Sequence, residues 1–243
     1  MKTYEVFNAG AILVKVTEAD LQNAVLSPHH LSVEIMHAAA KSSFHQLIPK
    51  IIETLTANVT IQRRVAAITL LALNSTSSIE TLLKLSEAEQ DKAVSYIFRA
   101  VALRLQGIEQ VRYNFFNASS DPTFHRYLIL IYNSNIKFTK EDLIFLFEAL
   151  NLYNNQSADW IRDRTRNMNS EDVKSILLFI SADRNKIETL IDSQTETQTI
   201  IATLNTTMER YNFRDVRNLC GKLIKRISRV DSSHPAAVPR AGE

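Results

Sequence analysis

The sequence predicts an all-α protein in which antiparallel helix pairs pack against one another. Only four glycines and five prolines occur in 243 residues, whereas sheet proteins and phosphate-binding loops use glycine freely. From residue 17 onward, apolar residues recur mainly with the spacing of helices, and capping residues mark many of the starts. The pattern leaves two architectures open, a short α-solenoid and an irregular multi-helix bundle.

The chain divides into three parts by its pattern. Residues 1–16 are the least helical part, and the apolar, partly β-branched run at 11–16 predicts an extended N-terminal arm. Residues 17–230 predict one helical domain. Residues 231–243 contain two prolines and no periodicity, which predicts a disordered tail.

Helix starts follow from Ser, Thr, Asp or Asn placed before an apolar-periodic segment. The predicted starts are Thr17, Ser27, Ser43, Thr60, Ser77, Ser86, Asp121, Thr139, Ser157, Asn169, Asp183, Ser193 and Asn212. The spacing of several neighbouring starts is close to half of a repeat of roughly 34 residues, which is typical of stacked helix pairs.

Residues 86–107 predict the helix around which the others pack. Ser86 and Glu89 have the spacing of a capping box, and Gly107 supplies a stop. Apolar residues cover two adjoining faces between these ends. A helix with two apolar faces packs on two sides, so we expect it in the middle of the assembly, where Ile97→Asp is expected to unfold the protein.

One segment resembles a known repeat. Residues 47–73 read LIPKIIETLTANVTIQRRVAAITLLAL, with an apolar first helix that has a proline near its start, a polar turn, and a second helix with Arg63, Arg64, alanines and leucines. This arrangement is similar to a HEAT repeat. Residues 77–105 follow the same pattern loosely, without the proline. The resemblance implies a HEAT-like α-solenoid.

Charge and cysteine content limit the setting in which the chain works. The net charge of +2 gives no global attraction to nucleic acid or anionic lipid. One cysteine, Cys220, excludes an internal disulfide and is typical of a reducing compartment. No signal-peptide pattern and no run of about 20 apolar residues is present. We therefore expect a soluble cytoplasmic protein without a membrane span.

No motif predicts catalysis. His30, Glu34 and His37 share a helical spacing, but three ligands in a line need a facing helix to surround a metal ion. Cys220 lies at an inward position between Val216 and Leu223, which favours a role in the core. Glycine-rich phosphate loops and Gly-x-Ser-x-Gly turns are absent from the sequence. We expect no metal, no cofactor, no small-molecule ligand and no catalytic residue.

Two charged segments are candidate interaction sites. The first contains the only tryptophan beside three arginines, a combination typical of protein interfaces, although intrahelical ion pairs also explain it. Its candidate partner-binding residues are Trp160, Arg162, Arg164 and Arg166. The second is the amphipathic C-terminal helix, whose basic face either meets solvent or binds an anionic partner or membrane. With the helix at 60–74, it supplies candidate phosphate contacts at Arg63, Arg64, Arg214, Arg217, Lys222 and Arg226.

The leading functional hypothesis is a non-enzymatic scaffold or adaptor that binds another protein, because stacked helix pairs expose long surfaces. The alternative is a helical nucleic-acid-binding protein that uses the basic C-terminal helix. A helical enzyme whose site residues are too scattered to recognise is the third hypothesis.

Overall fold

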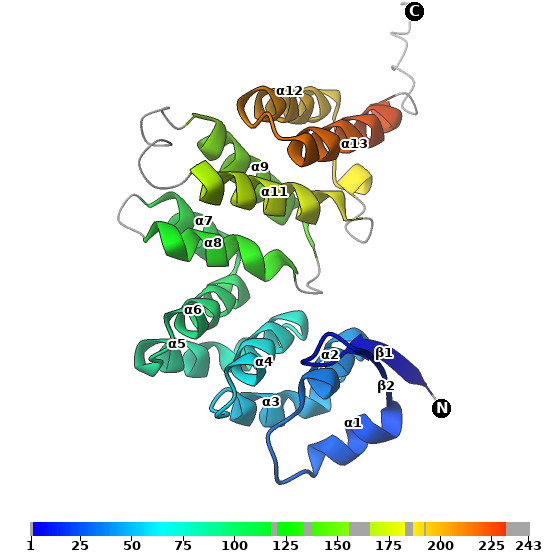
Figure 1. The fold of residues 1–243 in the computed structure, drawn as a ribbon, viewed down its shortest axis with the longest axis vertical. Coiled ribbons are helices and arrows are strands. Elements are labelled where there is room, and N and C mark those ends of the chain that lie inside the picture. The colour runs from blue at the N-terminus through cyan, green and yellow to red at the C-terminus, as the bar shows by residue number, and fades with distance from the viewer. Residues whose placement is uncertain are drawn as a thin grey trace, which may run out of the picture. The chain divides into compact units, whose positions relative to one another are not determined.

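A computed structural model describes residues 2–117, 121–133, 138–155, 166–182, 187–191 and 193–231. Over these residues the protein is all-α apart from one small two-stranded sheet, which confirms the predicted fold class (Figure 1). The chain forms two compact units, Met1–Lys137 and Phe138–Glu243. The sequence, read as one helical stretch from 17 to 230, gave no sign of this division.

The first unit begins with a hairpin and continues as helices. Its strands are β1 (Thr3–Phe7) and β2 (Leu13–Thr17). Its helices are α1 (Glu18–Val25), α2 (Val33–Ser42), α3 (Ile48–Thr54), α4 (Thr60–Ala72), α5 (Ile79–Ala88), α6 (Lys92–Gln106), α7 (Ile108–Phe116) and α8 (Pro122–Leu130). Short 3-10 turns occupy His45–Leu47, Thr76–Ser78 and Ile131–Asn133.

The N-terminal segment is extended, as expected, but it folds back on itself as an antiparallel hairpin. Val6 pairs with Val14, and Val6 and Val16 are buried, while both strands pack on α2. In the connecting loop, the Asn8 side chain accepts hydrogen bonds from the amides of Gly10 and Ile12. The loop is held by this asparagine side chain and lacks the two-residue turn sequences, such as Asn-Gly, by which a hairpin is most easily recognised.

Helices of the first unit pack as consecutive pairs. The pairs are α1 with α2, α3 with α4, α5 with α6 and α7 with α8, and the second helices α2, α4, α6 and α8 also contact one another in that order. Alanines at the α4 and α6 contacts are fully buried, among them Ala66, Ala67 and Ala100. Small side chains let the helix backbones approach closely.

Two connections between pairs have the same backbone geometry. Ser43 after α2 and Asn74 after α4 both have left-handed φ values, 56° and 52°. The next residues, Phe44 and Ser75, donate their amides to the carbonyls of Ala39 and Leu70, and a 3-10 turn follows in each case. The chain therefore reverses in the same way after two successive pairs.

Several predicted starts are correct. Thr17 and Asp20 form a capping box, Asp121 accepts from the Thr123 amide, and Ser193 accepts from the Glu196 amide. Thr139, another predicted start, forms a capping box with Asp142 through hydrogen bonds of 2.9 Å and 3.3 Å.

Other starts are wrong. Residues 27–30 are not helical, and α2 begins at Val33 after Ser32. Ser43 ends α2 instead of starting a helix. The aromatic segment after Gly107 was not predicted as a helix, but it forms α7. Ser157 and Asp183 lie outside the described residues.

The predicted long helix at 86–107 is two helices. Ser86 belongs to α5, the chain leaves the helix at Glu89, and α6 starts after Asp91, whose side chain accepts from the amides of Ala93 and Val94. From there to Gly107 the prediction holds. α6 buries Phe98 and Val101 completely and contacts α4, α5, α7 and α8, so its central place in the unit is confirmed.

The second unit contains four long helices in its described residues. These are α9 (Lys140–Asn155), α11 (Arg166–Ser181), α12 (Gln194–Arg210) and α13 (Arg214–Asp231), with a 3-10 turn at Ile187–Thr189. α9 contacts α11 and α12, and both of these contact α13. No helix among the described ranges is both long and apolar enough to cross a bilayer.

Candidate interaction surfaces

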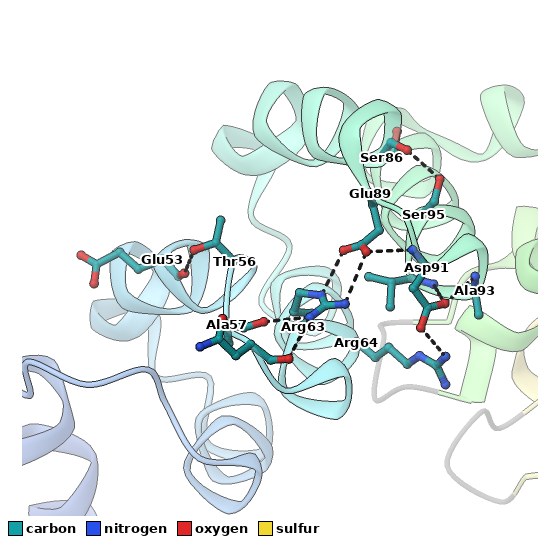
Figure 2. Close-up of polar contacts among 12 residues, drawn as sticks. Glu53, Thr56, Ala57, Arg63, Arg64, Ser86, Glu89, Asp91, Ala93 and Ser95 are labelled. Carbon is teal, nitrogen blue, oxygen red and sulfur yellow. Dashed lines mark hydrogen bonds and ion pairs between the residues drawn. The ribbon is translucent and has the colours of Figure 1, made fainter.

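Arg63 and Arg64 lie where α4 meets the turn between α5 and α6 (Figure 2). Arg63 Nε lies 3.0 Å from Glu89 Oε2, and both side chains are only about 15% exposed. The same guanidinium donates to the carbonyls of Ala57 and Asn58. Arg64 pairs with Asp91 at 3.5 Å and is more exposed. Both arginines therefore join two consecutive helix pairs, and their guanidinium groups already have anionic partners.

The tryptophan segment lies mostly outside the described residues. Trp160, Arg162 and Arg164 belong to the range 156–165, which the structure does not describe. Arg166 is the first residue of α11, and only its backbone is described. The prediction that these residues bind a partner remains a prediction.

The three residues aligned as metal ligands do not share a helix face. His30 precedes α2, whereas Glu34 and His37 lie within it. His37 Nδ1 is 2.8 Å from the Phe7 carbonyl oxygen, and because a carbonyl only accepts, Nδ1 carries the proton in this contact. Within the described ranges, no three His, Cys, Asp or Glu residues are grouped closely enough to hold a metal ion.

Cys220 is completely buried in α13, between the buried side chains of Val216 and Leu223. Burial raises the pKa of its thiol to about 12. At neutral pH the sulfur is therefore a thiol and not a thiolate, and it has the character of a small apolar core residue.

A groove lies between the hairpin and the helices of the first unit. Its volume is about 470 Å³, and it is lined by β1, by the C-terminal halves of α2 and α4, and by Leu130 at the end of α8. Its apolar lining includes Ala40, Ile68 and Ala72. Phe7 and Leu130 are 56% and 38% exposed. We call this feature the hairpin groove.

The free edge of β1 belongs to this groove. Hydrogen bonds from Asn8 to Ile12 and from Glu18 to Lys2 fix which residues pair across the hairpin. Backbone groups alternate in an antiparallel pair, so those of Glu5 and Phe7 point away from β2. Lys41 donates to the Glu5 carbonyl at 3.0 Å, and His37 donates to the Phe7 carbonyl. Two basic side chains of α2 thus hold this strand edge at the groove.

A second hollow, of about 260 Å³, lies between α9 and α12 of the second unit. Leu143, Phe147 and Ile200 contribute to its apolar lining. Lys140 and Glu196, which also line it, form an ion pair of 2.9 Å between the two helices.

The basic residues of α13 are on its solvent side. Arg214, Arg217 and Lys222 are exposed, while Arg226 is half-buried and donates to the Ser181 carbonyl at 3.1 Å. The structure thus separates the candidate phosphate contacts into two kinds. Arg63, Arg64 and Arg226 are at least partly buried beside intramolecular partners, whereas Arg214, Arg217 and Lys222 are exposed, and Arg217 also donates to the Asn212 side chain at 3.2 Å.

The hairpin groove was missed by sequence reasoning. The alternation of Tyr4 and Val6 with Thr3 and Glu5, and of Val14 and Val16 with Lys15, was the available signal for a half-buried hairpin. Even with that signal, the groove depends on Ile68 and Leu130, which are far away in the sequence.

Comparison with protein families, with curated proteins and with solved structures found no match for this chain.

Proposed function

We propose that the protein is a non-enzymatic interaction scaffold whose hairpin groove holds an extended segment of another protein. The observation that carries this proposal is the groove itself, because it places the edge of β1 that does not pair with β2 beside an apolar lining. Extended peptides bind at such edges through main-chain hydrogen bonds, and nearby pockets select alternate side chains.

The chemistry of the groove favours a peptide as its occupant. The outward backbone groups of Glu5 and Phe7 offer donors and acceptors to an added strand, and each carbonyl has a second lone pair beside its contact with α2. Ile68, Ala72 and Leu130 offer apolar contacts for its side chains. The ammonium group of Lys41, which also lines the groove, favours an acidic residue in the segment.

The serial packing of the first unit supports the scaffold role. α3 and α4 coincide with the HEAT-like segment 47–73, and the matching reversals at Ser43 and Asn74 recur between successive pairs. We propose that these pairs are repeats of one helical unit. Repeated pairs produce surfaces along which partners bind.

Site-specific photo-crosslinking in the native cell tests the proposal. A photoreactive phenylalanine analogue replaces Leu130 at the groove, and in a control it replaces Ile61, which is similarly exposed at the start of α4 and does not line the groove. We expect a distinct protein adduct from position 130 only. The adduct should disappear when the exposed Phe7 is also changed to Glu, since the charge disrupts the apolar rim.

Equal adducts from both positions, or an adduct from position 130 that persists with Phe7→Glu, would contradict the groove as the binding place. Complete absence of adducts from position 130 would contradict the scaffold role of this face.

A further inference from the structure

The solvent side of α13 is a ridge of positive charge. Arg214, Arg217, Lys222, Lys225 and Arg229 are exposed along it, and we call them the basic ridge. Between Arg214 and Arg229 the helix rises about 22 Å. The opposite side of the helix, with Val216, Leu223 and Ile227, is buried in the core of the second unit.

Within α13 itself, acidic residues are few. Between 214 and 230 the only one is Asp215, and its carboxylate pairs with Lys174 of α11 at 2.5 Å. The hydrogen bond from Lys174 holds the pKa of Asp215 below its ordinary value, so the pair is ionised and contributes no net charge at neutral pH. Asp231 is the last residue of the helix.

We propose that the basic ridge binds the phosphate backbone of a nucleic acid without reading its sequence. A DNA strand advances about 3.4 Å per nucleotide, so about six phosphates of one strand lie along a helix segment of this length, and the five exposed cations are comparable in number. Arginine and lysine side chains on one helix face contact phosphates directly and release the counterions condensed on them. This surface goes beyond the proposed scaffold role of the first unit.

The structure favours phosphate over two other anionic partners. An amphipathic helix binds a membrane by inserting its apolar side, but that side of α13 is packed against α11 and α12. A specific protein interface needs a desolvated apolar centre, whereas the described exposed positions of α13 are charged or polar. Phe213, 45% exposed just before the helix, offers a surface on which a base stacks.

Fluorescence anisotropy with the full chain tests the ridge. The probes are a labelled single-stranded RNA of mixed sequence and a labelled DNA duplex at about 50 mM salt. We expect binding whose affinity falls steeply with salt, with a logarithmic slope of about −2 to −4. Lys222→Glu with Lys225→Glu should weaken binding at least about tenfold, since two phosphate contacts become repulsive.

A matched control separates the ridge from net charge. Lys2→Glu with Lys84→Glu changes the total charge equally at exposed positions of the first unit, and it should leave the affinity within about twofold. Circular dichroism of both double variants verifies that they remain folded.

Three results would overturn the proposal. The first is no binding to either nucleic acid at low salt. The second is an equal loss of affinity in the control variant. The third is tighter ridge-dependent binding to a polyglutamate peptide or to phosphatidylserine vesicles than to both nucleic acids, which would assign the surface to an acidic protein or to a membrane.

Discussion

Two residues accept left-handed backbone geometry at the ends of α2 and α4. Ser43 has φ 56° and ψ 41°, and Asn74 has φ 52°. A side chain in this region costs about 1–2 kcal/mol, less for asparagine, and glycine avoids that cost. The chain therefore turns in the same way after both helices although the backbone is strained there. The strain is larger at Ser43, because serine tolerates left-handed geometry less well than asparagine.

Ser43→Gly is expected to raise the free energy of unfolding by about 0.5–1 kcal/mol, because relief of the strain outweighs the extra freedom of glycine in the unfolded chain. Asn74→Gly should give a smaller gain, and Ser43→Val should be destabilising. Urea unfolding followed by circular dichroism measures all three. A lower stability for Ser43→Gly would mean that the Ser43 side chain supports the turn in a way its exposed position does not suggest.

His125 makes the stability of the first unit depend on pH. Its ring is 4.8 Å from that of Phe115, and burial lowers its pKa despite the opposing charge of Asp121. The unfolded chain therefore binds this proton more readily than the folded one. The stability contributed by the neutral His125 side chain is fully present above the pKa of histidine in the unfolded chain, about 6.5. It is lost as the pH falls from there toward the lower pKa of His125 in the folded protein.

We expect unfolding at about pH 5.5 to need less denaturant than at about pH 7.5. His125→Gln should flatten this dependence, because it removes the titrating group and retains a polar side chain. Carboxylates with a lowered pKa, such as Asp121, act in a more acidic range. An unchanged pH dependence in His125→Gln would exclude His125 as its source.

At the scale of elements, the turn between α5 and α6 explains why the sequence suggested a single helix there. Ser86 and Glu89 fit a capping box, but Glu89 instead binds Arg63 of α4 and accepts from the Asp91 amide. The Ser86 side chain donates to the Leu83 carbonyl inside α5. The spacing of residues along the chain cannot reveal that Arg63, on another helix, forms an ion pair with the Glu89 carboxylate.

The Arg63–Glu89 pair should contribute more to stability than the Arg64–Asp91 pair. The first pair is mostly buried at 3.0 Å, and the second is about one-third exposed at 3.5 Å. A double-mutant cycle with Arg63→Ala and Glu89→Ala should give a coupling energy of about 1–2 kcal/mol. The cycle with Arg64→Ala and Asp91→Asn should give less than about 1 kcal/mol, since exposed pairs are screened.

Asn replaces Asp91 in this cycle because it retains an acceptor for the cap of α6. Denaturant unfolding of the single and double variants supplies both energies. Equal couplings, or a stronger one for the exposed pair, would contradict a leading role for Arg63 at this junction.

At the scale of the whole molecule, the sequence predicted the all-α fold class correctly, whereas its local patterns contain no signal for the two compact units. Thr17, Thr139 and Ser193 carry caps that depend on neighbours three residues away, so local reasoning found them. The hairpin groove depends on Ile68 and Leu130 lying near β1, an arrangement of distant parts of the chain that no local pattern contains. The helical spacing at 47–73 indicated a pair of helices, but it did not indicate where the series of helix pairs ends.

Each unit has its own buried core, so we expect the two to respond separately to damage. Phe98 is fully buried in α6 of the first unit, and Phe98→Ala should cost about 3–5 kcal/mol. Cys220, the only cysteine, reports on the second unit, because its buried thiol with a pKa of about 12 reacts only after that unit opens. Phe98→Ala should therefore shift the denaturation curve and leave the rate of Cys220 labelling under native conditions unchanged.

Leu223→Ala is the matched control, since it removes a buried side chain one turn from Cys220 within the second unit. It should accelerate the labelling of Cys220, because it lowers the free energy needed to open that unit. Labelling by a neutral-pH thiol reagent, followed by mass spectrometry, gives both rates. If Phe98→Ala accelerates the labelling of Cys220 as much as Leu223→Ala does, the two units unfold as one cooperative block, and the separate cores do not act as separate folding units.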